Sequence, residues 1–196
     1  MSKGNVVGII DIVMGNNPEF TADSAALYDR LCDGRDRLDV PVDFGQIALD
    51  VGGRNGKYTP VINELGPSAV RVIDPAAGTL QWMVDQDYAR PDTVYLGTLQ
   101  EWVAERPNPA DSAFVFNMNP RVAGDDEFAH ALIRAVRTGG WIVTSMMEPV
   151  TAWEFYMSAI RHSPGQVRLR GNAEPARSPR LTHFGPNCYI QFWQRT

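Results

Sequence analysis

The chain has 196 residues with a formal net charge of −5, and 44% of its residues are apolar and 21% charged. This is the composition of one globular domain, and the negative charge argues against a surface devoted to nucleic acid, which usually leaves a basic footprint. The apolar run at residues 6–14 is too short to cross a membrane. No small-residue cleavage pattern follows it, so neither a signal peptide nor a membrane partner is expected.

The first 44 residues form an N-terminal preamble. Residues 6–13 are β-branched and apolar, and their pattern fits a strand or a helix equally well. A helix is predicted over residues 22–32, with Gly34 as its stop signal. We expect residues 1–44 to form a helical lid or a dimerisation element in front of a catalytic domain that spans residues 45–196.

From residue 45 onward, apolar strands alternate with helical segments. The predicted strands are residues 46–51, 69–74, 93–97, 112–118, 141–147, 166–170 and 187–195. The predicted helices are residues 57–66, 76–86, 99–106, 125–140 and 151–162. Such alternation indicates a parallel sheet covered by helices on both faces. The last two strands have no helix between them, so they are expected to pair antiparallel at one edge. The predicted fold is a three-layer α/β sandwich with a mostly parallel sheet of about seven strands and an antiparallel terminal strand.

The first strand of this alternation ends in Asp50 and leads into a turn that contains Gly52, Gly53 and Gly56. In open parallel sheets, ligands bind outside the carboxyl ends of the strands. Glycine permits positive φ and lets a ligand approach the main chain, and the helix that follows offers free N–H groups to an anion. The second strand ends in Asp74, in the position of an acid that accepts hydrogen bonds from a ribose.

The dinucleotide pattern G-x-G-x-x-G does not fit this turn, because its later glycines would fall on Arg54 and Lys57. The pattern acid-x-Gly-x-Gly-x-Gly fits better. With the stretches "VRVIDP", "SAFVFNMNP" and "LIRAVRTGGWIVTSM" in the right order and spacing, residues 45–196 resemble the class I S-adenosylmethionine-dependent methyltransferases. The resemblance implies a seven-stranded sheet and S-adenosylmethionine as the cofactor.

The resemblance also implies a set of cofactor-binding residues: Asp50, Gly52, Gly53, Arg54, Gly56, Asp74, Pro75, Thr98 and Asn117. Asp50 and the main chain of the glycine turn would hold the methionine end of the cofactor. Asp74 would accept the ribose hydroxyls, and Pro75 would lie beside the adenine. Many relatives read the adenine amino group with an acid or amide after the third strand, where this chain has Thr98.

Arg54 stands where the family has its middle glycine. Its guanidinium can bind the methionine carboxylate as a bidentate partner, or it can point to solvent. A third reading is that Arg54 marks a site that no longer binds the cofactor. A non-glycine residue in the left-handed conformation costs about 1–2 kcal/mol.

Two residues are candidates for catalysis. His183 begins the last strand, and an antiparallel direction would return it to the ligand face, where it could deprotonate an acceptor hydroxyl. Glu148 follows the fifth strand and could be a general base. For His183 the alternative is a structural role, and for Glu148 it is capping of the next helix. Asn117 lies in "NMNP", which resembles in part the Asn-Pro-Pro-aromatic motif of amino-group methyltransferases. The alternative is a polar turn that caps the fourth strand.

The sequence therefore predicts a cytoplasmic enzyme that transfers the methyl group of S-adenosylmethionine to an oxygen or nitrogen of a small-molecule acceptor, without a metal. Cys32 and Cys188 have neither the number nor the spacing of a metal site or a disulfide framework. A homodimer is left open. Two alternatives stand beside this prediction. One is a methyltransferase-fold protein that acts as a binding or partner subunit or hosts other chemistry. The other is a nucleic-acid methyltransferase that uses the four arginines of residues 168–180.

Overall fold

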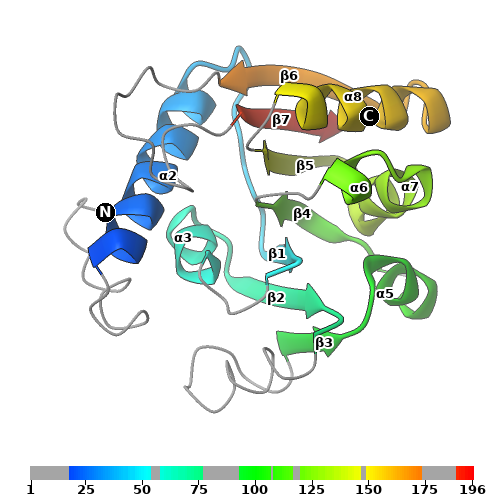
Figure 1. Ribbon diagram of the computed structural model, residues 1–196, viewed down its shortest axis with the longest axis horizontal. Helices are drawn as coiled ribbons and strands as arrows, with labels where there is room; N and C mark the ends of the chain where they lie inside the picture. The colour runs from blue at the N-terminus through cyan, green and yellow to red at the C-terminus, as the bar shows by residue number, and fades with distance from the viewer. Residues whose placement is uncertain are drawn as a thin grey trace.

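The structure is a computed structural model that describes residues 18–53, 58–76, 93–106, 108–116, 120–146, 149–173 and 189–196. Figure 1 shows one sheet with helices on either side. The elements follow in the order α2 (Pro18–Asp36), β1 (Ile47–Val51), α3 (Thr59–Glu64), β2 (Ala69–Asp74), β3 (Val94–Leu96), α5 (Leu99–Glu105), β4 (Ala110–Val115), α6 (Pro120–Ala123), α7 (Asp126–Ala135), β5 (Val136–Met146), α8 (Pro149–His162), β6 (Val167–Ala173) and β7 (Tyr189–Arg195).

The strands lie in the order β3-β2-β1-β4-β5-β7-β6. The pairs β1–β2, β1–β4, β2–β3 and β4–β5 are parallel, whereas β7 runs antiparallel to both β5 and β6. The first strand, β1, lies in the middle of the sheet, and β2 and β3 follow it toward one edge. The chain then crosses back to β4 on the other side of β1, and the remaining strands extend the sheet toward the opposite edge. Strand order therefore reverses between β1 and β4, which is the place where open α/β sheets bind ligands.

Two hydrophobic clusters hold helices against opposite faces of the sheet (Figure 1). On one face, α5, α7 and α8 bury Trp102, Leu132 and Phe155 against strand residues that include Leu49. On the other face, α2 and α3 contribute Leu27, Leu31, Val61 and Ile62 to a cluster with Ala48, Phe114 and Trp141. Neighbouring strand residues such as Ala48 and Leu49 belong to opposite clusters because side chains alternate along a strand. The predicted three-layer sandwich is confirmed.

The predicted end of the first helix is wrong. Helix α2 continues through Gly34 and ends at Asp36. Glycine in a helix costs only about 1 kcal/mol relative to alanine, which the burial of Leu27 and Leu31 on the same helix offsets. Gly34 is itself buried, so its missing side chain allows close packing there. The α2 helix is thus part of the core, while the lid function expected for residues 1–44 stays a prediction.

The helix predicted over residues 125–140 ends too late, because the Gly139-Gly140 pair at its predicted end lies inside a strand. Helix α7 ends at Ala135 and β5 begins at Val136, before the two glycines. The pairing of β4 with β5 shifts register there, and Gly139 has a φ of +79°. A Cβ on Gly140 would lie 2.3 Å from the carbonyl oxygen of Asp111. The glycines therefore permit an irregular, close-packed strand rather than a helix end.

Two predicted elements fall outside the described residues: the apolar run at 6–13 and, apart from Ala76, the helix at 76–86. The strand predicted at 69–74 has those bounds in the structure. Across the described ranges, no helix is both long enough and apolar enough to cross a bilayer.

Candidate functional site

Two buried carboxylates lie at the carboxyl ends of neighbouring central strands. Asp50 precedes the last residue of β1 and is 2% exposed, and Asp74 ends β2 and is 4% exposed. In the parallel register Asp50 pairs with Val72, so Asp74 lies two residues further toward the same sheet edge. The alternation of β2 places Val72 and Asp74 on one face, which brings two acids to the switch point of the sheet.

The Asp50 carboxylate is held by the first residue of the next helix. Thr59 begins α3, and its hydroxyl donates a 2.6 Å hydrogen bond to Oδ2 of Asp50. Burial raises the pKa of Asp50 to about 6, the Thr59 hydrogen bond opposes this effect, and the charge of Asp74 adds to it. A cation placed beside Asp50 would favour its ionised form. The side chain is therefore suited to hold an ammonium group.

The turn after β1 depends on glycine for two different reasons. Gly52 has a φ of +72°, its N–H donates to the carbonyl of Ile73 at 2.8 Å, and no atom of the described residues lies within 4 Å of where a Cβ would stand. At Gly53, a Cβ would lie 2.7 Å from Cγ1 of Val72 and 2.9 Å from Oδ2 of Asp50. The first glycine supplies a conformation with open space above it, and the second allows the main chain to approach the Asp50 carboxylate.

Asp74 organises the turn that follows β2. Its Oδ1 accepts a 2.7 Å hydrogen bond from the N–H of Ala76, and its carbonyl accepts one from the N–H of Gly97 at 3.2 Å. Pro75 and Ala76 are exposed. The residue expected beside an adenine therefore lies on an open surface directly above a buried acid.

The Thr98 side chain forms a capping box at the start of α5. Its hydroxyl accepts from the N–H of Glu101 at 3.2 Å and donates to Oε2 of Glu101 at 2.9 Å. The N–H of Thr98 donates to the same oxygen at 2.7 Å. These hydrogen bonds hold the pKa of Glu101 below its usual range. The acid that follows β3 is thus Glu101, in the first turn of α5 and three residues after Thr98.

Aromatic side chains stand beside the glycine turn. Tyr58 is the N-cap residue of α3, and its ring contacts Phe116, at the end of β4, edge to face with centroids 5.3 Å apart. Phe116 is 8% exposed and also lies 5.8 Å from Phe114, which in turn contacts Phe44. These aromatic rings connect the glycine turn after β1 to the hydrophobic core between the sheet and helices α2 and α3.

Five of the predicted site residues lie outside the described residues: Arg54, Gly56, Asn117, Glu148 and His183. Their roles stay predictions. Within the described ranges, no group of three or more His, Cys, Asp or Glu side chains is arranged to hold a metal ion. The structure brings together Asp50, Gly52, Gly53 and Asp74. Sequence reasoning missed Thr59 and Glu101, although "TLQE" at residues 98–101 is the sequence signature of a capping box.

Known structures share this architecture. The ribosomal protein L11 methylase of Lactobacillus delbrueckii subsp. bulgaricus aligns with a TM-score of 0.60 at 10% identity, over 85% of this chain and 77% of its own. This chain has the class I methyltransferase fold. Fibrillarin of Aeropyrum pernix, in complex with natively bound S-adenosyl-L-methionine, aligns with a TM-score of 0.58 at 13% identity, over 81% of this chain and 70% of its own.

An rRNA methylase of Streptococcus thermophilus shares the fold as well, with a TM-score of 0.55 and 13% identity over 86% of this chain and 93% of its own. No protein-family model matches the sequence, and no curated protein matches it. The expectation that nucleic acid is an unlikely partner is not supported, since a methylase of rRNA has the same fold.

Proposed function

We propose that the protein is an S-adenosylmethionine-dependent methyltransferase. The observation that carries the proposal is the pair of buried acids, Asp50 and Asp74, at the ends of adjacent central strands with the glycine turn between them. A buried carboxylate whose pKa is raised accommodates the ammonium of the methionine end. Gly53 is packed against Asp50 and Val72, whereas no described atom lies within 4 Å of the Cβ position of Gly52, which leaves room for a ligand against the main chain there. The residues therefore fit this cofactor.

The chain's own residues would act by binding and orientation. Asp50 would hold the ammonium, the main chain at Gly52 and Gly53 would lie against the methionine, and Asp74 would accept the ribose hydroxyls. S-adenosylmethionine supplies a methyl group on a sulfonium, which is already an activated leaving group. The protein's task is then to fix the acceptor atom in line with that methyl group, a contribution that positioning alone can make large.

Calorimetric titration with S-adenosylmethionine and S-adenosylhomocysteine, on protein freed of carried-over ligand, tests the proposal. Micromolar binding of both is expected. Asp74→Asn should weaken both by about 10- to 100-fold, because hydrogen bonds to a charged group are lost. The matched control is Asp39→Asn, which changes an exposed acid outside the site. Folded protein that binds neither ligand would reject the proposed cofactor.

For the acceptor, we propose a hydroxyl or amine of a small molecule. The acidic composition of the chain supports this choice over a polyanion. Solved structures of this fold include a methylase of rRNA, a methylase of a ribosomal protein and a precorrin-6y C5,15-methyltransferase, so the fold itself does not select the acceptor. Formation of S-adenosylhomocysteine with small hydroxyl and amine compounds, but not with rRNA or ribosomal protein, is the expected result.

A second candidate is a protein of this fold that binds the cofactor or a partner without transferring methyl groups. The observation that favours it is the commitment of the Thr98 hydroxyl to Glu101, where many relatives read the adenine. Arg54 bears on the same question. If Arg54→Gly strengthens cofactor binding, the natural site has decayed, and if the substitution weakens binding, Arg54 is a working ligand.

A further inference from the structure

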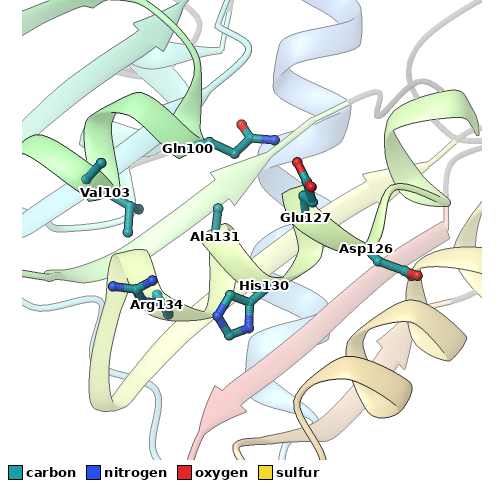
Figure 2. A pocket seen from close by; sticks show the side chains of 8 residues that line it. Gln100, Val103, Asp126, Glu127, His130, Ala131 and Arg134 are labelled. Carbon is teal, nitrogen blue, oxygen red and sulfur yellow. The ribbon is translucent and has the colours of Figure 1, made fainter.

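A groove runs along the outer surface of the helical layer between α5 and α7. It encloses about 440 Å³, and Figure 2 shows the side chains that line it. From α5 these are Gln100, Val103 and Ala104, and the α7 side includes Glu127, Ala131 and Arg134. The lining positions are 100, 103 and 104 on α5 and 126, 127, 130, 131 and 134 on α7, so each helix presents one side to the groove. The groove lies on the side of the sheet opposite α3 and therefore apart from the Asp50 carboxylate.

The floor of the groove is apolar and made of small side chains. Ala131 is buried, Val103 is half-buried and Ala104 is exposed. Small residues allow another backbone to approach closely, and their methyl groups offer an apolar surface. His130 adds a half-buried ring whose Nδ1 lies 3.4 Å from Oγ of Ser163. Asp126 lies at one end, but its carboxylate is already engaged by the hydroxyl of Ser158 from α8.

Opposite charges mark the two ends of the groove. In Figure 2, Glu127 lies at one end and Arg134 at the other, with Ala131 between them. They are seven residues apart on α7, which corresponds to about 10 Å along the helix axis. Both are exposed, and within the described part of the chain neither side chain has an ion-pair partner. This arrangement is complementary to a segment that carries a base and an acid two helical turns apart.

We propose that the groove is the docking site of an amphipathic helix from a partner protein. The partner helix presents apolar residues at i, i+3/i+4 and i+7 to Val103, Ala104 and Ala131, as in other helix-in-groove complexes. A lysine or arginine of that helix lies beside Glu127, and an aspartate or glutamate lies beside Arg134. A nucleic-acid strand fits less well, because its phosphates would approach the carboxylates of Glu127 and Asp126.

The probe for this proposal is a synthetic, alanine-rich helical peptide of about 14 residues, which spans about 21 Å when helical. It carries leucines at the i, i+4 and i+7 positions, with a lysine and a glutamate seven residues apart on the same face. A second peptide has lysine at both charged positions, so that one lysine faces Arg134 in either direction of docking. Each is titrated into the isotope-labelled full-length protein while backbone amide shifts are recorded. Shift changes are expected along α5 and α7, with about 3- to 30-fold tighter binding of the better-matched peptide.

Charge reversal on the protein sharpens the test. The variant Arg134→Glu, which makes both ends of the groove acidic, should invert the preference between the two peptides. Arg161→Glu, at an exposed arginine on α8 outside the groove, is the matched control and should change nothing. Ala104→Arg fills the groove and should abolish the shift changes, which keeps the test decisive should Arg134→Glu not fold. Equal binding of both peptides, shift changes away from α5 and α7, or no saturable change at millimolar peptide would each overturn the proposal.

Discussion

The hydroxyl of Thr59 donates a 2.6 Å hydrogen bond to the buried carboxylate of Asp50. This contact joins the start of α3 to the end of β1 across the glycine turn, so the turn is closed by one side-chain pair. Because Asp50 is fully buried and lies near Asp74, its charge is costly in the ligand-free protein. The pair therefore links the stability of the turn to the occupancy of the site.

We expect the stability of the ligand-free protein to depend on the ionisation of Asp50. Its pKa is about 6 in the folded state against an ordinary value of 3.8 for an aspartate in water, so the protonated form is favoured by folding. This contribution is fully present below about pH 4 and is lost as the pH rises through about 6, which amounts to about 2–3 kcal/mol. Asp50→Asn should therefore be more stable than the natural chain at pH 8 and equally stable at pH 4.

Urea unfolding of both proteins between pH 4 and pH 8 measures this difference. The comparison cancels the titration of other acids, among them Asp111, whose pKa is lowered by its hydrogen bonds to main-chain N–H groups and Arg137 despite partial burial. Asp39→Asn serves as the control at an exposed acid. A stability difference between Asp50→Asn and the natural chain that stays constant over this pH range would contradict the assignment.

The same carboxylate should couple ligand binding to protons. Under the proposed function, the ammonium of S-adenosylmethionine favours ionised Asp50, so binding should release a proton near pH 6 and tighten as the pH rises from 5 to 7. Titration calorimetry in buffers of different ionisation enthalpy measures the number of protons released. Asp50→Asn should bind more weakly and show no such release from this position. Proton uptake by the natural chain would be the opposite of the expected sign.

The two glycines of the turn should respond differently to alanine. Gly52→Ala should cost about 1 kcal/mol of stability through its positive φ and should also weaken cofactor binding, because the new methyl group enters open space above the turn. Gly165 is the matched control, with a φ of +74° and no described atom within 4 Å of its Cβ position. Gly165→Ala should lose similar stability and keep full affinity.

Gly53→Ala should lower both the cofactor affinity and the stability more than Gly52→Ala or Gly165→Ala does, since its Cβ would lie against Val72 and Asp50. Thermal unfolding and calorimetric titration of the three variants separate the two effects. Full cofactor affinity in Gly53→Ala would remove this glycine from the site.

Replacing Thr98 should lower the stability of the protein, through helix α5, more than it lowers the affinity for the cofactor. Thr98→Ala removes the side-chain half of the capping box and should cost about 1 kcal/mol, within the 0.5–2 kcal/mol range of N-cap substitutions. Thr98→Ser should restore most of it. Since the hydroxyl already bonds to Glu101 in both directions, we expect cofactor affinity to change by less than about threefold. A tenfold loss in Thr98→Ala, rescued by serine, would instead make the hydroxyl an adenine ligand.

The sequence predicted most of the sheet because its strands carry continuous apolar runs between clear turn residues. The strand at Ala69–Asp74 was predicted to the residue, and the acids at the two strand ends followed from it. The structural roles of the glycines were predicted less well, because glycine occurs at helix ends, within helices and in strands. Gly34 lies within a helix, and Gly140 permits contact between strands, yet each looks like a helix stop in one dimension.

Contacts between distant segments could not be predicted. Asp111 of β4 accepts hydrogen bonds from the N–H groups of Gln46 and Ile47 at 2.8 Å, which fixes the start of β1 from 64 residues away. The hydrogen bond between Thr59 and Asp50 depends on the path of the turn between them, and the sequence around neither residue predicts it. By contrast, the box of Thr98 and Glu101 is local and was readable from its spacing.

Strand β7 is the last element of the chain, yet it lies inside the sheet between β5 and β6. During synthesis from the N-terminus, β6 emerges before the strand that joins it to the rest of the sheet. The second core cluster is likewise incomplete until Ile190 and Phe192 are free of the ribosome. The sheet can therefore close only after β7 has left the ribosome, and a nascent chain stopped before β7 would expose the edge of β5 to other chains.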